Sequence, residues 1–562
     1  MRSRLSGSAA IALALWPLLV PGSLAGRGRI DSRPQAAERS DPVGVRESLL
    51  ARLDPDADPQ TISVDPLTIR RVSWISGGKG SQRMVLDGVP GPVFDRVFSP
   101  YPAREAALND LVWWWPDAQD CLSMFSPDGS RAAYAAKRGK WFVVADGVEH
   151  GPYDAVLGLP AFSPDGRHAT WEARVRGKLV RVVDGVVHGP FENRLDALSR
   201  RGVDYFSPDS RRVAFPARMR EGGRTVERMI VDGANGPPHR MVGNPHFSPD
   251  SRHLAYWAHA EGQRGLQLMI DGKQVTQTTK ASPELLEFLD NVLSDSGLPF
   301  APDGTHVAFV TERDGRLVPV VRGKEGPPCD WISPLRFSAD FSRAAYVIGR
   351  KRNALSAFSA LVTLSPGPCS DYACRLVVDG IEQTEGLSPG DPPVILTPDG
   401  RHAPVYLSPD GRTVAYVTVG NIVVNGAAVS PRGEDAYAPA FSPDGTRVAC
   451  VVRRDGRTYV KIGGAEGGAA EQIEPLVMRV SGRRTLLTFS PDGRHVVGLV
   501  RQGPLDMLAI DLGARSPGYD SIVGGMIVFD APTVVAFAAR YGRDVLRVEV
   551  DLDSLATPSG RR

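Results

Sequence analysis

The chain has 562 residues, with 66 lysines and arginines, 64 aspartates and glutamates, and a formal net charge of +2. Acidic and basic residues are interspersed rather than grouped in blocks, which excludes the basic footprint of a nucleic-acid-binding protein. The five cysteines are few and odd in number, and no pair of them has the spacing of zinc ligands. We therefore expect no nucleic-acid partner and no metal site.

The first 25 residues predict a signal peptide. Arg2 and Arg4 give a positive start, residues 9–20 are apolar, and Ser23-Leu24-Ala25 is a small-x-small cleavage site. The apolar run is short and is interrupted by a proline, so it is unsuited to spanning a membrane. We expect cleavage after Ala25, a periplasmic or secreted protein, and no integral membrane span in the mature chain.

Residues 26–66 are rich in arginine, aspartate and proline, and they predict a linker with a short helix over residues 43–53. Asp54, Asp56 and Asp58 alternate as they do in a calcium loop. The glycine and the distal glutamate of that loop are missing, so we interpret this stretch as solvated.

A first repeat-like unit covers residues 72–97 and is followed by an insertion that contains Trp113, Trp114 and Trp115. If exposed, these tryptophans would form an aromatic platform for a sugar or a protein partner. If buried, they would simply contribute packing. They are the candidate partner-binding residues of the sequence.

A short phrase then recurs along the chain, Phe-Ser-Pro-Asp-Gly. Intact copies begin at Phe125, Phe162, Phe441 and Phe489, a Leu-led copy at Leu407, and looser copies at Phe206, Phe247, Phe300, Phe337 and Leu396. Proline and aspartate suit the two central positions of a type I turn, and glycine supplies the left-handed residue that follows, so the phrase predicts a tight β-hairpin. Two copies carry Ser210 and Ser251 in place of glycine; if φ is positive there, each costs roughly 1 kcal/mol.

The unit around Phe162 shows what accompanies the phrase. A Gly-Lys turn at residues 177–178 precedes the strand-like run 179–183, and Asp184-Gly185 precedes the His-Gly-Pro-Phe of residues 188–191. Four short runs separated by turn residues predict an antiparallel meander. A repeat of roughly 40 residues with four strands is typical of a β-propeller blade.

The phrase followed by a Val-Ala-Tyr type run resembles the WD40-like propeller repeat of the TolB type, over roughly residues 69–552. This resemblance implies a β-propeller. The second half of the unit, Asp-Gly followed by Gly-Pro-aromatic, departs from the short TolB-type motif, and the sequence attaches no function to it.

We expect an all-β fold, a β-propeller of about eleven four-stranded units. Because one ring usually has four to eight blades, we expect two tandem propellers rather than one ring, over residues 67–330 and 331–556, with a tail over residues 557–562. The stretches 276–298 and 351–374 are candidate junctions or insertions. A short amphipathic helix is expected in the first of them, either capping the channel or docking a partner.

Histidines recur at two positions of the repeat, and equivalent positions in different blades do not converge on one site. We therefore expect exposed strand residues rather than ligands at His168, His253, His306, His402 and His495, and at His150 and His188.

The cysteines divide into two groups. Cys369 and Cys374 are close enough in sequence for one local disulfide in an oxidising compartment, which remains an open alternative. Cys121, Cys329 and Cys450 are expected to be buried apolar residues.

The TolB-like resemblance implies a non-enzymatic scaffold that binds a protein partner at the cell envelope. The chain has no Gly-x-Ser-x-Gly elbow of an α/β-hydrolase, and no catalytic or cofactor-binding residue is assigned. Two alternatives stay open: an enzyme with its site in the central channel, such as a polysaccharide lyase or a hydrolase, and a sensor module for a small ligand.

Overall fold

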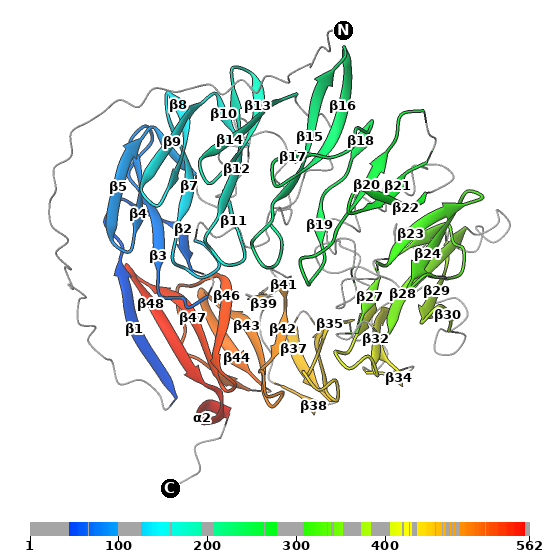
Figure 1. Cartoon of the computed structure of the whole chain (residues 1–562). Coiled ribbons are helices and arrows are strands. Elements are labelled where there is room, and N and C mark those ends of the chain that lie inside the picture. Colours follow the sequence, from blue (N-terminus) through cyan, green and yellow to red (C-terminus); the bar gives the residue numbers. More distant parts are fainter. Residues whose placement is uncertain are drawn as a thin grey trace, which may run out of the picture. The chain divides into compact units, whose positions relative to one another are not determined.

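The computed structural model of the chain is an all-β structure (Figure 1). It describes residues 44–65, 67–98, 125–157, 160–192, 206–262, 265–277, 300, 307–333, 335–338, 342–351, 372–383, 405–418, 421–425, 427–429, 435–455, 457–463, 465–467, 472–474, 476–478, 484–511 and 513–556.

The described strands form eleven blades arranged in a ring, and neighbouring strands within a blade run antiparallel apart from one parallel pair in blade 11. Blade 1 contains β2 (Ala57–Val64), β3 (Val72–Ser76), β4 (Gln82–Leu86) and β5 (Val89–Phe94), and blade 2 contains β6 (Arg96–Phe98), β7 (Ala133–Arg138), β8 (Lys140–Ala145) and β9 (Val148–Tyr153). Blade 3 contains β10 (Ala155–Val156), β11 (Ala161–Phe162), β12 (Ala169–Val175), β13 (Lys178–Val183) and β14 (Val186–Phe191), and blade 4 contains β15 (Ala214–Glu221), β16 (Arg224–Val231) and β17 (Ala234–Asn235). Blade 5 contains β18 (Met241–Val242), β19 (His246–Phe247), β20 (Leu254–His259), β21 (Gln267–Ile270) and β22 (Lys273–Gln277).

Blades 6 to 11 follow the same plan. Blade 6 contains β23 (Phe309–Arg313), β24 (Arg316–Val321) and β25 (Lys324–Glu325), and blade 7 contains β26 (Trp331–Ile332), β27 (Arg336–Phe337), β28 (Ala344–Lys351), β29 (Tyr372–Val378) and β30 (Ile381–Glu382). Blade 8 contains β31 (Val405–Leu407), β32 (Val414–Thr418), β33 (Asn421–Val424) and β34 (Ala427–Ala428), and blade 9 contains β35 (Asp435–Phe441), β36 (Val448–Arg454), β37 (Arg457–Ile462) and β38 (Ala465–Glu466). Blade 10 contains β39 (Gln472–Glu474), β42 (Leu487–Phe489), β43 (Val496–Gln502), β44 (Leu505–Ile510) and β45 (Ala514–Arg515), and blade 11 contains β46 (Ser521–Ala531), β47 (Val534–Tyr541), β48 (Asp544–Asp551) and β1 (Val45–Arg52), with β40 (Leu476–Met478) and β41 (Arg484–Thr485) alongside β46.

The repeated phrase forms the predicted hairpin between the first two strands of a blade. In the first intact copy the Gly129 N–H donates to the Ser126 carbonyl at 2.8 Å, and Gly129 has φ +69°. The buried Ser126 hydroxyl donates to Asp128 at 2.5 Å and accepts the Arg131 N–H at 2.9 Å. Each residue of the phrase therefore has a structural role in the turn.

Ser210 and Ser251 keep the positive φ of the glycine that they replace, at +64° in both cases. Each hydroxyl also accepts a backbone N–H from the hairpin of the preceding blade, Asp165 N–H for Ser210 and Asp209 N–H for Ser251, both at 2.9 Å. A hydrogen bond of this kind is worth about 1 kcal/mol, which offsets the expected strain.

The Asp-Gly of the second half-unit closes the hairpin between the third and fourth strands. Asp146 and Gly147 both have positive φ, as a type I′ turn requires. The Asp146 carboxylate accepts the Ala132 N–H at 3.1 Å and pairs with Arg131 at 2.7 Å. The same pairing of a basic side chain with the turn aspartate recurs as Arg71–Asp87, His168–Asp184, Arg212–Asp232, His253–Asp271, Arg343–Asp379 and His495–Asp511.

The aspartate after the buried aromatic residue at the end of the outer strand links one blade to the next. Asp95 accepts the N–H of Gly139 in the second-to-third-strand turn of blade 2 at 2.7 Å, and Asp154 accepts that of Gly177 in blade 3 at 3.2 Å. The half-unit without an assigned function is thus a crossover that fixes the position of the following blade.

Apolar clusters join each blade to its neighbour in sequence, and one cluster joins blade 11 to blade 1. The all-β class and the eleven four-stranded units are confirmed. The preference for two tandem propellers is not supported by this packing, because the expected boundary at residue 330 falls inside a cluster that Leu268, Leu317 and Tyr346 of blades 5, 6 and 7 share.

The last blade is completed by the first described strand. β1 pairs antiparallel with β48 through seven residue pairs from Val45–Val550 to Arg52–Asp544, and the two strands lie side by side in Figure 1. The helix predicted over residues 43–53 is therefore wrong, and the predicted linker contains the strands β1 and β2. The short helix α2 (Leu552–Ala556) follows β48.

Candidate partner-binding rim

The fourth, outermost strands of blades 1 to 4 share one pattern of exposure. Residues 89–93, 148–152, 186–190 and 234–238 each run exposed, exposed, half-buried, exposed, exposed, and each run is followed by a buried side chain. We call these 20 residues the neutral rim.

The neutral rim is depleted in charge. Charged residues make up 23% of the chain, yet the 20 rim residues include a single one, Glu149, which pairs with Arg138 at 2.6 Å. The outer strands of other blades do carry charges, among them Lys273, Lys324 and Glu466. Charge depletion is the compositional mark of the centre of a protein–protein interface.

Exposed apolar side chains gather on the same strands. Of the eight large hydrophobic side chains that are exposed among the described residues, five lie on the rim: Val89, Val93, Val148, Val186 and Val187. Scattered exposed valines are ordinary, but a contiguous group on neighbouring elements marks an interaction site.

The rim is unsuited to binding a partner by strand addition. It contains six prolines, which lack an N–H to donate, at positions 90, 92, 152, 190, 237 and 238. Register shifts interrupt the pairing of β5, β9 and β14 with their neighbours. Prolines and bulges are the devices that protect edge strands from pairing with another chain, so a partner would contact side chains.

Two histidines of the rim pack against the second strand of the next blade. The His150 ring lies 5.0 Å from the Trp171 ring of blade 3, and the His188 ring lies 6.1 Å from the Phe215 ring of blade 4. Burial lowers the pKa of both histidines, which favours their neutral form and keeps the rim uncharged.

The site residues predicted from sequence lie mostly outside the described residues. Four of them are not described: Trp113, Trp114, Trp115 and Cys369. Cys374 belongs to β29, but its side chain is not described. The tryptophan platform and the disulfide therefore stay predictions.

The expected burial of two cysteines is confirmed. Cys329 and Cys450 are buried, and burial raises the pKa of Cys329 to about 12. A thiol of this kind remains protonated at neutral pH, so Cys329 contributes packing rather than reactivity.

The rim itself was missed at the level of the sequence. Its signal, the near-absence of charged residues after four successive Asp-Gly turns, becomes visible only when the repeats are aligned at these positions.

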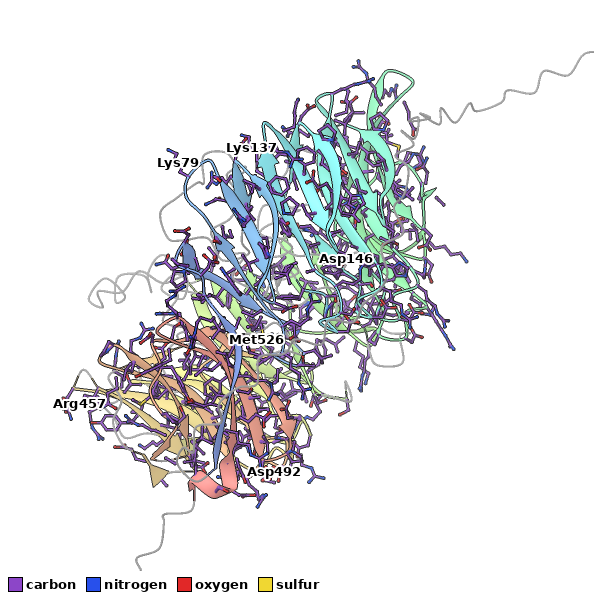
Figure 2. The ribbon with its side chains drawn as sticks, turned by 90° about the vertical axis from the view of Figure 1, so that its left-hand side faces the viewer. Lys79, Lys137, Asp146, Arg457, Asp492 and Met526 are labelled. Atoms are coloured by element: carbon purple, nitrogen blue, oxygen red, sulfur yellow. The ribbon has the colours of Figure 1, made fainter. Side chains whose placement is uncertain are left out.

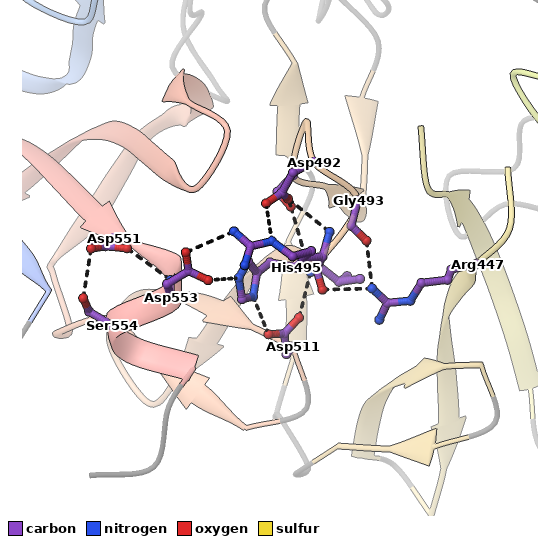
Figure 3. Close-up of polar contacts among 11 residues, drawn as sticks. Arg447, Asp492, Gly493, His495, Asp511, Asp551, Asp553 and Ser554 are labelled. Carbon is purple, nitrogen blue, oxygen red and sulfur yellow. Dashed lines mark hydrogen bonds and ion pairs between the residues drawn. The ribbon is translucent and has the colours of Figure 1, made fainter. Parts of the chain in front are cut away.

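One histidine departs from the exposed placement expected for its repeat position (Figure 3). The His495 side chain is 9% exposed, and its two ring nitrogens lie 2.8 Å from Asp511 and 3.0 Å from Asp553. Arg494 bridges Asp492 and Asp553, which joins the hairpin of blade 10 to α2. Both ring nitrogens are occupied by carboxylates, so the arrangement suits a structural imidazolium.

This cluster gives a pH-dependent stability. Burial opposes the charged ring, but the hydrogen bonds from Asp511 and Asp553 outweigh it and raise the pKa of His495. A raised folded-state pKa means that the stabilisation is complete below pH ~6.5, the unfolded value, and is lost as pH rises through the folded value. We expect His495→Gln to lower the unfolding free energy by about 1–2 kcal/mol at pH 6 and by less at pH 9, in urea titrations.

A matched control is available in blade 3. His168 occupies the same repeat position, is 43% exposed and contacts one carboxylate, so His168→Gln should have a smaller effect at both pH values. An equal loss for His495→Gln at pH 6 and pH 9 would contradict the assignment.

Within the described ranges, no group of three or more His, Cys, Asp or Glu side chains is placed to hold a metal ion. No helix in that part of the chain is both long and apolar enough to cross a membrane.

Comparison with known proteins gives a likeness of fold. No family model and no curated protein matches the chain. Similar solved structures include TolB from Acinetobacter baumannii (14% identity, 71% of this chain and 80% of that chain, TM-score 0.20) and the β-propeller domain of the Trilobed protease from Pyrococcus furiosus (11%, 62% and 96%, 0.23). An oligogalacturonate lyase in complex with manganese is also similar (15%, 62% and 99%, 0.24). The chain is a multi-blade β-propeller, consistent with the TolB-like and WD40-like propellers whose repeat phrase it resembles.

Proposed function

We propose that this chain is an exported, non-enzymatic β-propeller scaffold that binds a protein partner at the cell envelope through the neutral rim. The observation that carries the proposal is the rim itself: four neighbouring outer strands with five exposed valines and one charge. The residues of the repeated phrase are occupied in turns and blade contacts, which leaves the outer strands as the distinctive surface of blades 1 to 4.

Export is supported by the start of the sequence, where Arg2 and Arg4 precede the apolar residues 9–20 and the Ser23-Leu24-Ala25 site. The TolB-like resemblance of the repeat agrees with a protein-binding role in that compartment. A rigid propeller suits such a role because it holds several outer strands in fixed relative positions.

Site-specific photo-crosslinking in intact cells tests the proposal. A benzoylphenylalanine at position 148 of the rim is expected to give a discrete cross-linked species in the envelope or secreted fraction. The matched control is position 275 on β22 of blade 5, where Val275 is also exposed but lies outside the rim.

Two outcomes would overturn the proposal. One is the same cross-linked species from both positions, or none from position 148. The other is turnover of envelope glycans or peptides by the purified mature chain, which would favour the enzyme with its site in the channel.

A further inference from the structure

The neutral rim lies between two rows of charge. Each of its strands begins after a turn aspartate or its equivalent, Asp87, Asp146, Asp184 and Asp232, and each aspartate is paired with an arginine or a histidine of its own blade. At the other end of these blades lie the turns between the second and third strands. Figure 2 shows Lys79 and Lys137 at that end and Asp146 at the opposite end.

The turns at that other end are basic. Their exposed cations in blades 1 to 4 are Lys79, Arg138, Lys140, Arg176, Lys178 and Arg224. Several have an acidic partner, such as Lys140 with Asp154 and Lys178 with Glu192. Lys79 and Arg176 make no ion pair among the described residues. One flank of the rim is thus neutralised and the other retains positive charge.

Equivalent positions on the rim carry small apolar side chains. Val89, Val148 and Val186 each follow the glycine of the Asp-Gly turn in successive blades, and Ala234 does so in blade 4. An amphipathic helix has an apolar stripe flanked by charged residues. A helix laid across the blades would therefore set its apolar stripe against these side chains and its charged flank toward one end of the blades.

We propose that the neutral rim binds an amphipathic helix of the partner, laid across blades 1 to 4, with its apolar face on the valines and acidic residues along the flank that faces Lys79 and Arg176. This deepens the proposed function and rests on it. The prolines of the rim disfavour an extended partner, and the unpaired cations disfavour a helix with a basic flank.

Peptide binding to the full mature chain tests the helix. The probe is a labelled helical peptide of about 22 residues with a leucine face and a glutamate flank, measured by fluorescence polarisation. The comparison peptides have the same face with a lysine flank, and the same composition arranged in strand-like alternation. We expect the glutamate-flanked helix to bind most tightly.

Substitutions locate the binding. Val148→Asp and Val186→Asp should each weaken the glutamate-flanked helix about tenfold, because a carboxylate would enter the apolar contact. Val275→Asp is the control, because Val275 is 56% exposed, close to the 58% of Val148, and lies outside the rim. It should change the affinity less than about twofold. All of these positions are exposed, so the thermal midpoints should match.

Three results would each contradict binding of an acidic amphipathic helix. They are tighter binding of the strand-like peptide, equal binding of the lysine-flanked and glutamate-flanked helices, and rim substitutions that do not change the affinity. Sedimentation that shows a dimer lost in Val148→Asp would assign the rim to a second copy of the chain instead. If the cross-link at position 148 in cells is observed but the helical peptide does not bind, the proposal of a helical partner is rejected and the proposed function stands.

Discussion

Deletion of residues 26–52 is expected to open the ring of blades and to lower the thermal unfolding midpoint by about 10 °C or more. The deletion removes β1, which supplies the outer strand of blade 11 and is the last element needed to close the circuit of blades. Circular dichroism melting and limited proteolysis of the purified chain measure the effect. Deletion of residues 26–43 alone is the matched control, and its midpoint is the reference from which the effect of losing β1 is measured.

The size of this effect follows from what β1 contacts. Its seven residue pairs with β48 make a backbone ladder whose hydrogen bonds are each worth about 1 kcal/mol. Arg52 pairs with Asp544 at 2.7 Å, and Tyr519 donates to Glu47 at 2.6 Å. Val45 is buried in the core between blades 10 and 11, and burial of such a side chain contributes about 2 kcal/mol. The sum is comparable with the whole net stability of a typical domain, about 5–15 kcal/mol.

A peptide of residues 44–54 provides the positive control. Added to the shortened chain, it should raise the midpoint in a concentration-dependent way, because a ligand that binds only the folded state stabilises it by mass action. A shortened chain that melts within about 2 °C of the control would show that the blades hold together without β1.

The strand β1 also shows why one part of the fold could not be predicted from sequence. Residues 43–53 are short, mixed in polarity and followed by turn residues, and a local pattern of this kind is compatible with a helix or a strand. What decides between them is a partner strand almost 500 residues away, Asp544–Asp551, whose free edge only β1 covers. Local propensity carries no information about that edge.

The blades, in contrast, could be predicted because their decisive residues act locally. Pro127, Asp128 and Gly129 shape one turn within five residues, and repetition of the phrase makes the same turn recognisable in blades 2 to 10. The neutral rim is intermediate in how far it can be predicted from the sequence. Its residues are near one another in each repeat, but its charge depletion is a property of four repeats together.

A third kind of residue escapes prediction because its role is conserved while its type is not. Gln82, Glu227 and Asp506 stand at one repeat position, at the start of the third strand or within it. Each side chain accepts a backbone N–H from the first strand of the next blade, given by Val97, Val242 and Ile522 at 3.0, 2.9 and 3.2 Å. Leucine occupies the same position in blades 3 and 6, at Leu179 and Leu317. A comparison of the repeats by residue type therefore gives no signal.

Glu227→Leu is accordingly expected to lower the unfolding free energy by about 3 kcal/mol, although leucine is native at the equivalent position of two other blades. Glu227 is fully buried, and its carboxylate lies 2.7 Å from the Arg218 guanidinium. Leucine would remove this acceptor of the buried Val242 N–H and the Glu227 counter-charge of Arg218, and breaking a fully buried ion pair costs about 3–5 kcal/mol. Partial exposure of Arg218, 20%, reduces that cost. Urea unfolding measures it.

A double-mutant cycle separates the two contributions. Arg218→Leu combined with Glu227→Leu should cost less than the sum of the single substitutions, because the double variant leaves no uncompensated charge. Glu149→Leu is the surface control: Glu149 pairs with Arg138 at 2.6 Å in an exposed position, and its loss should change the free energy by less than about 0.5 kcal/mol. Additive single effects would show that the Val242 hydrogen bond alone accounts for the loss. A near-neutral Glu227→Leu would mean that blade 4 adopts the apolar packing of blades 3 and 6 at no cost.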